Sequence, residues 1–384
     1  MNQKTLGIYI HIPFCVKKCL YCDFVSDVAT SFMKENYVNC LIKEIQIKTN
    51  QLCNYTVDTV FIGGGTPSVL DAEWIKIILC KLKETFVFSK EYECSIEVNP
   101  GTVDFNKLQE YRNAGINRLS IGLQSCNDNE LKALGRIHDY HAFEETYLAA
   151  RQAGFDNINV DLMSSIPEQT EESFIQSLNQ VIYLKPEHIS VYSLIVEEGT
   201  PFYDMDLNLP DEDTERQIYY KTGQILQEYG YEQYEISNYA KPGKECKHNI
   251  RYWQCDEYIG FGVAAASYLN NVRWKNTENI AQYIKYIQDA NCVEDLQKDA
   301  FGSEKEILSK MEQCAEFMFM GLRMNKGVSE AEFIRRFGVT PDVKYGEVIA
   351  KHIKNGLLIK DGKYIRLTDK GRDICNYVMS DFLL

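Results

Sequence analysis

The sequence predicts an α/β protein, a partial (β/α)6 barrel followed by a small C-terminal α+β module of winged-helix type. Short runs of β-branched and aromatic residues alternate with longer runs of helical period, which is typical of βα units around a parallel sheet. Six consecutive units favour a barrel or partial barrel, although the pattern is also compatible with a doubly wound sheet. From residue 303 the order changes to two helical runs, a hairpin at Asp361-Gly362 and a further strand.

The individual elements follow from these periodicities. We expect parallel strands over 6–12, 58–64, 93–98, 118–124, 158–163 and 188–195, with helices over 33–50, 72–85, 104–114, 141–153 and 170–184. A helix should begin near Asp211, with a strand after it over 231–240. We therefore divide the chain into a partial barrel (1–200), a barrel extension and connecting region (201–302) and a winged-helix-like module (303–384).

Composition and charge exclude several classes of protein. Of the 384 residues, 45% are hydrophobic and 25% are charged, as in ordinary globular proteins. The net charge of −14 argues against binding to nucleic acid or to anionic membrane surfaces. Because residues 303–384 are close to neutral, we favour a packing role for this module over DNA binding.

No stretch predicts a transmembrane helix or an export signal. The apolar run 258–269 is too short to span a bilayer and is expected in the core. The run 6–16 contains His11 and Pro13 and lacks a cleavage site of small residues, so we expect a cytoplasmic protein.

The cysteines indicate a metal site and not a disulfide framework. The chain has thirteen, an odd number, and three of them, Cys15, Cys19 and Cys22, form C-x3-C-x2-C. Structural zinc is the simpler alternative, but it needs four ligands, and no second CxxC pair is present. Three thiolates suit an iron–sulfur cubane that leaves one iron free to bind a cofactor.

Polar residues at the ends of the predicted strands indicate what this cofactor is. The segment "GGGTP" (63–67) lets a ligand approach the backbone closely, although it is equally compatible with a plain turn. Glu97, Gln124 and Asp161 end other strands, where they could bind ribose hydroxyls and an amine. Together they favour a polar, nucleoside-like ligand.

These motifs resemble those of the radical S-adenosylmethionine (SAM) superfamily. "CVKKCLYC" is similar to its cluster motif and "GGGTP" to its methionine-binding element; with "IEVNPG", "LGRIHD" and "NVDLM", nearly the whole chain resembles the oxygen-independent coproporphyrinogen III oxidase-like family. The resemblance implies a [4Fe–4S] cluster on Cys15, Cys19 and Cys22, with SAM on its open iron. It implies SAM contacts at Tyr9, Tyr21, Gly64, Gly65, Thr66, Glu97, Gln124, Arg136 and Asp161.

Within this family, three features resemble the haem chaperone (HemW-type) subgroup more than the oxidases. The oxidases have a fourth cysteine where this chain has Phe24, and a longer segment before the cluster motif than the 14 residues present here. "HNIRYW" (248–253) resembles the H-N-x-x-Y-W element that this subgroup associates with haem binding. The resemblance thus implies haem contacts at His248, Asn249, Tyr252 and Trp253, although a histidine beside aromatic residues is also common as a packing residue.

One segment departs from the family pattern. In "DLMSSIPEQT" (161–170), two serines stand where relatives usually show an aromatic or aliphatic residue and a glycine. This difference makes the shape of the loop after Asp161 an open question.

The sequence therefore leads to one main hypothesis and two alternatives. The main one is a haem chaperone that binds haem and transfers it to an acceptor protein, without coproporphyrinogen III oxidase activity. The alternatives are that oxidase, or another radical reaction on a tetrapyrrole, and a winged-helix regulator with an inert barrel. An electron donor and a homodimer are compatible with each hypothesis that keeps the cluster active.

Overall fold

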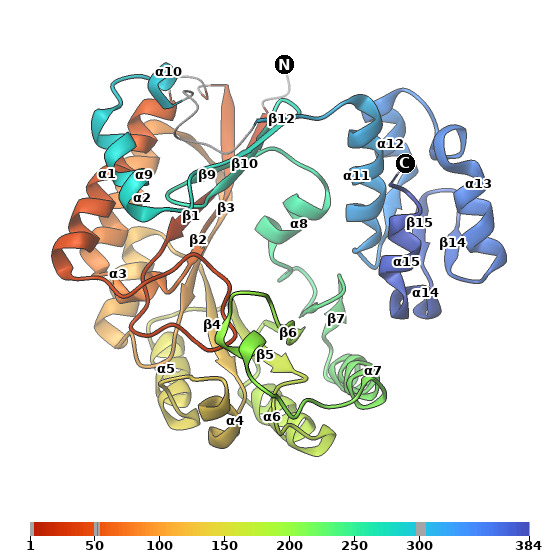
Figure 1. The fold of residues 1–384 in the computed structure, drawn as a ribbon, viewed down its shortest axis with the longest axis horizontal. Helices are drawn as coiled ribbons and strands as arrows, with labels where there is room; N and C mark the ends of the chain where they lie inside the picture. Colours follow the sequence, from red (N-terminus) through yellow and green to blue (C-terminus); the bar gives the residue numbers. More distant parts are fainter. Residues whose placement is uncertain (1–3, 50–51, 53, 297–304, 384) are drawn as a thin grey trace.

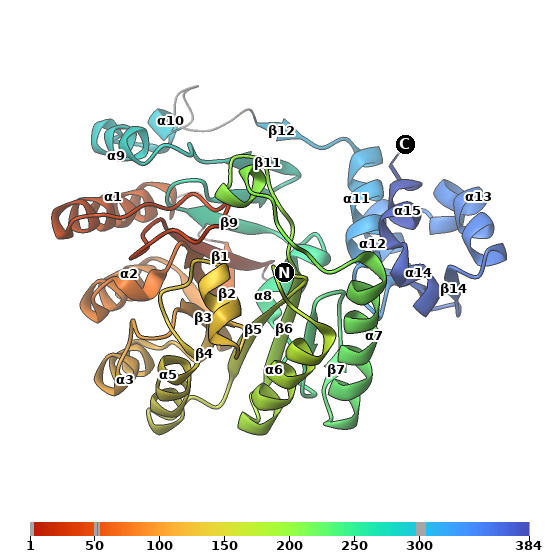
Figure 2. The same cartoon turned by 60° about the horizontal axis from the view of Figure 1, so that its bottom comes forward.

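A single large sheet organises the N-terminal three quarters of the protein. The structure, a computed structural model, describes residues 4–49, 52, 54–296 and 305–383. Six parallel strands lie side by side in chain order and form an arc with helices on its outer side (Figures 1 and 2). The strands are β1 (Lys4–Ile12), β2 (Tyr55–Gly64), β3 (Val87–Val98), β4 (Arg118–Gln124), β5 (Ile158–Ser164) and β6 (His188–Ser193). The predicted α/β fold class is confirmed.

Helices cover the outer side of this arc, as the sequence predicts. They are α1 (Ser31–Thr49), α2 (Ala72–Thr85), α3 (Phe105–Ala114), α5 (Tyr140–Gln152) and α6 (Glu171–Leu184). The predicted helices over 104–114 and 170–184 each begin one residue early, because Asp104 and Thr170 are N-caps that accept hydrogen bonds from Lys107 N and Ser173 N. A short helix, α4 (Asp128–Ala133), was not predicted.

Alternating polarity along the parallel strands gives the sheet two different faces. In β4, the apolar side chains of Leu119, Ile121 and Leu123 are fully buried, whereas Arg118 and Gln124 line a cavity on the inner side of the arc. Because side chains alternate across a strand, the same spacing places polar groups of β3, β5 and β6 on that inner side. The inner face is therefore built to hold a ligand.

The sheet continues beyond the parallel strands at both edges. Strand β9 (Tyr258–Phe261) pairs in parallel with β1, and β10 (Ala266–Leu269), β11 (Val272–Lys275) and β12 (Glu306–Ile307) add antiparallel pairs. The run 258–269, predicted as core, thus supplies two strands. Within the described residues the sheet is open, because its order runs from β12 to β7 (Glu232–Gln233) without a closing pair.

The strand predicted over 231–240 was wrong as a continuous element. The segment forms two short antiparallel strands, β7 and β8 (Asn238–Ala240). The buried carboxylate of Glu235 accepts hydrogen bonds from Ser237 N and Asn238 Nδ2, which turns the backbone between them. The preceding helix, α7 (Glu212–Glu228), begins after the N-cap Asp211, as expected.

The C-terminal module has the expected helices and hairpin, but three helices precede the hairpin where two were expected, and the further strand predicted after it was wrong because that segment is helical. Helices α11 (Lys310–Leu322), α12 (Glu330–Phe337) and α13 (Pro341–Lys354) precede the hairpin of β14 (Leu358–Lys360) and β15 (Tyr364–Leu367), and β13 (Val328–Ser329) completes a three-stranded sheet. Two short helices follow, α14 (Asp369–Asp373) and α15 (Cys375–Ser380). This module packs beside α7 and the inner helix α8 (Lys247–Trp253) (Figure 1).

The two larger of three hydrophobic clusters among the described residues reflect this division. One spans both sides of residue 200 and includes Ile8, Ile218 and Tyr283; the other lies within the C-terminal module around Met318 and Phe333. The proposed boundary at 302/303 lies outside the described residues, and the three-part division remains a prediction. Among the described helices, none has the length and apolar character needed to cross a bilayer.

Candidate functional site

The loop that carries Cys15, Cys19 and Cys22 joins β1 to α1 and is held closed by backbone hydrogen bonds. Cys15 N donates to Asp27 O at 3.0 Å, and Asp27 N donates to Pro13 O at 2.9 Å. The three cysteines are half-buried and carry free thiols. The loop thus brings them together above the carboxyl end of β1.

The chemistry of this donor set fits an iron–sulfur cluster. Arg136 Nη1 donates to Cys19 Sγ at 3.4 Å, so a fixed cation lies beside one of the three sulfur atoms. Among the described residues, no three side chains are placed to hold a single metal ion. Three thiols that do not converge on one point suit a cubane, whose irons occupy separate corners.

The "GGGTP" segment lies directly beneath this loop and allows close approach. Gly65 N donates to Ile12 O at 2.9 Å, and a Cβ at Gly65 would lie 2.9 Å from Phe14 O and 3.0 Å from Cys15 Sγ. Gly64 has φ +116°, and a Cβ there would meet the His11 ring at 2.8 Å. Glycine is therefore required by the packing of this segment against the cysteine loop, not merely by a turn.

Two carboxyl groups face the space below the glycines. Burial and repulsion from Asp161 raise the pKa of Glu97 to about 8, although Gly64 N donates to its Oε2 at 3.1 Å. Burial also raises the pKa of Asp161, which accepts hydrogen bonds from Asn159 Nδ2 at 2.7 Å and Ser120 Oγ at 3.3 Å. A pair of desolvated acids is a favourable place for a positively charged ligand group, because its charge would relieve their repulsion.

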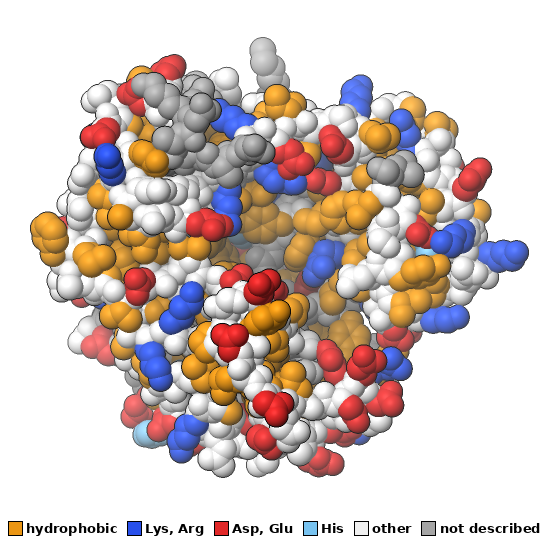
Figure 3. Space-filling model, in the orientation of Figure 1, with side chains coloured by type: hydrophobic (Ala, Val, Ile, Leu, Met, Phe, Trp, Pro, Cys, Tyr) orange, Lys and Arg blue, Asp and Glu red, His pale blue; other side chains and the backbone are white. Residues whose placement is uncertain are grey.

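One cavity of about 510 Å³ collects nearly all of the predicted site residues. Its lining includes the three cysteines and all nine residues that the resemblance assigns to SAM: Tyr9, Tyr21, Gly64, Gly65, Thr66, Glu97, Gln124, Arg136 and Asp161. His248, Asn249 and Tyr252 of α8 line the same cavity. Figure 3 shows the molecule hollowed near the middle of this face, with hydrophobic side chains around the hollow.

Comparison with known proteins agrees with this site. Residues 9–181 match the model of the radical SAM superfamily, and residues 308–374 match that of the HemN C-terminal domain. The heme chaperone HemW of Lactococcus lactis is 35% identical over 100% of this chain and 99% of its own length, and that of Bacillus subtilis is 35% identical over 98% of both.

The chain belongs to the HemW family of radical SAM proteins.

A solved structure agrees with this assignment. The radical SAM enzyme coproporphyrinogen III oxidase, HemN, of Escherichia coli superposes with a TM-score of 0.85 at 25% identity, over 99% of this chain and 90% of its own. The family resemblance inferred from the motifs is thus confirmed. Radical SAM membership implies an iron–sulfur cluster and SAM.

Helix α8, which carries the HemW-type element, lies inside the arc and not at the strand ends. Its N-terminus is held by the buried carboxylate of Glu93, which accepts hydrogen bonds from Lys247 N and His248 N at 3.1 Å each. His248 packs against the ring of Phe61 in β2. The element therefore lines the lower end of the cavity, opposite the cysteine loop.

The ring of His248 has no free nitrogen. Nδ1 shares a hydrogen bond with Thr59 Oγ1 and Nε2 with Tyr252 Oη, each at 2.9 Å. Burial and the charges of Arg251 and Arg118 lower the pKa of His248 to about 3, so the imidazole is neutral. His248 therefore packs against Phe61 and orients Tyr252. Ligation of iron by the His248 ring would require one of its two hydrogen bonds to break.

Trp253 lies outside the cavity lining, unlike its neighbours in this HemW-type element. Its ring stacks on the guanidinium of Arg323, 4.4 Å away, and lines a second cavity together with residues of the C-terminal module. Helical geometry explains the difference, because positions 248 and 252 share one face of α8, whereas position 253 points about 100° away. The sequence analysis did not predict this helix, so the two faces of the motif could not be separated there.

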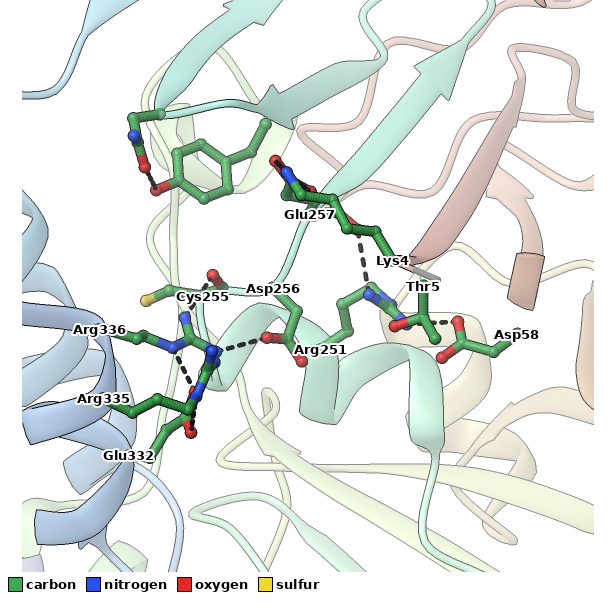
Figure 4. A network of polar contacts seen from close by, with 12 residues as sticks. Lys4, Thr5, Asp58, Arg251, Cys255, Asp256, Glu257, Glu332, Arg335 and Arg336 are labelled. Atoms are coloured by element: carbon green, nitrogen blue, oxygen red, sulfur yellow. Dashed lines mark hydrogen bonds and ion pairs between the residues drawn. The ribbon is translucent and has the colours of Figure 1, made fainter. Parts of the chain in front are cut away.

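Arginines on both sides of α8 fix it between the sheet and the C-terminal module (Figure 4). Arg251 pairs with Asp58 of β2, and its Nη1 donates to Glu257 O at 3.1 Å. Arg336 of α12 pairs with Asp256 at 2.6 Å and donates to Cys255 O at 3.0 Å. The helix that lines the cavity thus also carries the contact with the module.

Two further differences from the sequence analysis concern β5. Asp161 was expected at a strand end but is the fourth residue of β5, so it faces the inside of the arc and not its rim. After the strand, Ser165 has φ +59°, and its buried hydroxyl has no partner among the described residues. A serine thus occupies a left-handed backbone conformation that favours glycine, at the cost of strain in this chain.

Several cavity residues were missed by the sequence analysis. Asn99 accepts a hydrogen bond from Arg136 Nη2 at 3.1 Å, and Arg118, Ser120, Asn159, Ser190 and Tyr192 line the lower part. The alternation of polar and apolar residues along these strands shows in the sequence that the polar ones share a face, but not that this face lines a cavity. The rim of the cavity includes Phe24, whose side chain is 68% exposed at the position where the oxidases have a cysteine.

Proposed function

We propose that this protein is a haem chaperone, which binds haem and passes it to an acceptor protein. The observation that carries this proposal is the end-to-end similarity to curated relatives named heme chaperone HemW. The cavity supports it, because a HemW-type element lines the same space as the cysteine loop. The cytoplasmic location, the homodimer and the electron donor considered above belong to the same proposal.

We propose that Cys15, Cys19 and Cys22 hold a [4Fe–4S] cluster. The backbone bonds of the loop orient the three thiols, and the guanidinium of Arg136 donates a hydrogen bond to the sulfur of Cys19. Burial raises the pKa of Cys22, opposed by the N–H of Phe24, so deprotonation of this thiol has to accompany iron binding.

We propose that the upper half of the cavity binds SAM. Gly64 and Gly65 line this half while they let the segment pack against the cysteine loop, and Glu97 and Asp161 provide the negative potential that attracts the cationic groups of SAM. When bound to a radical SAM cluster, SAM can supply a 5′-deoxyadenosyl radical. Whether that chemistry or only SAM binding serves haem transfer is a separate question from the carrier function.

The lower half of the cavity is our proposed site of haem contact. Phe61 and Tyr252 present aromatic rings there, which suit the flat apolar face of a porphyrin, and His248 and Asn249 lie beside them. Trp253 is left out of this proposed contact, because it faces the C-terminal module.

The test is a haem titration of the anaerobically reconstituted protein, followed by the Soret band. We expect saturable binding, and transfer of the bound haem to an apo-haem protein on mixing. His248→Ala should weaken haem binding or shift its spectrum while iron content stays unchanged, because Tyr252 loses its partner.

His141→Ala is the matched control, since this histidine is exposed on α5 and pairs only with Glu145 among the described residues. Absence of haem binding by the unaltered protein would contradict the proposed function. If the two variants have identical haem spectra and affinities, the lower half of the cavity is not the site of haem contact.

A further inference from the structure

A buried arginine lies at the floor of the cavity, away from the cysteine loop. Arg118 is the first residue of β4, pairs in register with Ser95 of β3, and lines the cavity while only 2% exposed. Gln124 ends the same strand, six residues further along, which corresponds to roughly 20 Å of strand. Arg118 therefore belongs to the opposite end of the cavity from the cluster loop.

Arg118 keeps its charge in this position. Burial opposes the charge, but the fields of Cys246, Glu93, Tyr234 and Asp161 outweigh it and raise the pKa of the guanidinium above its ordinary value. A permanent cation is thus enclosed at the floor.

The neighbouring carboxylates do not neutralise this cation by direct contact. Glu93 is occupied by the N-terminus of α8, and Asp161 by Asn159 and Ser120. Among the described residues, none of the carboxylates lies within ion-pair distance of Arg118. Within the described part of the chain, Arg118 donates one side-chain hydrogen bond, from Nη1 to Ser95 Oγ, and it is long at 3.5 Å. The Nε of Arg118 has no partner there.

An incompletely paired guanidinium is costly to bury, because the desolvation of its donors is not repaid. The guanidinium of arginine is planar, and two of its N–H donors can bond to the two oxygens of a carboxylate or phosphate at once. Ser120, Asn159 and Ser190 line the floor beside Arg118, but their polar groups bond to one another and to Asp161, so they do not pair with the guanidinium.

We propose that Arg118 forms a carboxylate-binding subsite at the floor of the cavity, and that it takes a propionate carboxylate of haem. The inference rests on the proposed haem-carrier function and adds to it the group that orients the porphyrin. SAM also carries a carboxylate, but the glycine segment and the cysteine loop that frame its proposed site lie at the far end of the strands.

The experiment compares haem with haem dimethyl ester, in which both propionates are esterified, by Soret titration of the reconstituted protein. The unaltered protein should bind haem about 10- to 100-fold more tightly than the ester, the range for a hydrogen bond between charged partners. In Arg118→Gln this ratio should fall to near one, with Arg118→Lys between the two. SAM affinity should be the same in all three proteins.

Arg151→Gln is the control, because Arg151 lies on α5 outside the cavity and pairs with Glu187 at 2.8 Å. The ratio should be unchanged in this variant. If haem binds but the unaltered protein does not distinguish it from the ester, the subsite is refuted while the proposed function stands, and this comparison needs no variant to fold.

A ratio that persists in a folded Arg118→Gln protein, or a loss confined to SAM affinity, would equally overturn the assignment. If the unaltered protein binds neither porphyrin, the proposed function fails and the propionate assignment fails with it. The two failures are therefore distinguishable.

Discussion

The buried carboxyl group of Glu97 indicates that the cavity binds a cationic ligand. It is enclosed beside a second acid, Asp161, and its pKa is raised to about 8. No described lysine or arginine forms an ion pair with it. A residue that only stabilised the fold would gain nothing from this arrangement, whereas a residue that receives a cationic ligand would.

The first prediction concerns the stability of the ligand-free protein with the change Glu97→Gln. An acid whose folded pKa lies above its ordinary value of 4.5 destabilises the fold increasingly as the pH rises from about 4.5 to about 8. Glutamine removes this penalty and can still accept the hydrogen bond from Gly64 N. The variant should therefore gain about 2–4 kcal/mol at pH 9 and much less at pH 5.

Urea unfolding of both proteins at the two pH values measures this difference. An equal change in the free energy of unfolding at pH 5 and pH 9 would show that the Glu97 carboxyl is not desolvated in the folded protein.

Not every functional residue could be assigned from the sequence. The cysteine spacing and the glycine segment could be assigned from the sequence alone, because few other kinds of site need those residue types so close together. Arg118 and Asn159 do not, because a polar residue in a strand carries no sign of whether it faces a ligand, a helix or water. Only the register of the sheet brings them to one floor.

Among the elements, α8 links the cavity to the C-terminal module. One face carries His248 and Tyr252 into the cavity, whereas Trp253 and the residues that follow contact the module. The sequence showed the motif but not its helix, since seven residues are too few for a clear helical period and tertiary contacts with Glu93 decide the conformation. The parallel strands, in contrast, were predictable because each has a strong apolar face.

A second prediction tests this link with Arg336→Ala. Arg336 is largely buried, pairs with Asp256 and Glu332, and donates to Cys255 O, so its removal leaves several acceptors without a donor. We expect the contact between α8 and α12 to weaken by about 1–3 kcal/mol. Amide hydrogen exchange should become faster in α8 and α12, while α2 and α3 keep their protection.

Arg335→Ala is the matched control, because Arg335 is exposed and pairs only with Glu332 among the described residues. Its effect should stay below about 0.5–1 kcal/mol. Equal exchange rates in the two variants would mean that Arg336 does not hold the module against α8.

At the scale of the whole molecule, two hydrophobic cores are joined through the inner side of an open sheet. The fold class could be predicted because βα alternation is a property of long stretches of chain. In the C-terminal module the hairpin could be predicted from its turn residues, but the number of helices before it and the helices after it could not. The place of β9 at the edge of the sheet could not be predicted either, because its pairing with β1 joins residues more than 200 positions apart, for which local pattern gives no signal. That pairing extends the sheet beyond its six parallel strands.

This architecture also explains why scaffold and function have to be tested separately. The chain shares its fold with an oxidase, HemN, and its end-to-end similarity with proteins named heme chaperones. One scaffold can serve both, since function depends on the residues of a site and not on the fold that carries it.

The most direct test supplies the reconstituted protein with SAM and a reductant, and offers coproporphyrinogen III and haem in parallel. A haem carrier should leave coproporphyrinogen III unchanged, while haem binds with a new Soret band and can be passed to an apo-haem protein. Conversion of coproporphyrinogen III to protoporphyrinogen IX at enzymatic rates, with no saturable haem binding, would contradict the account.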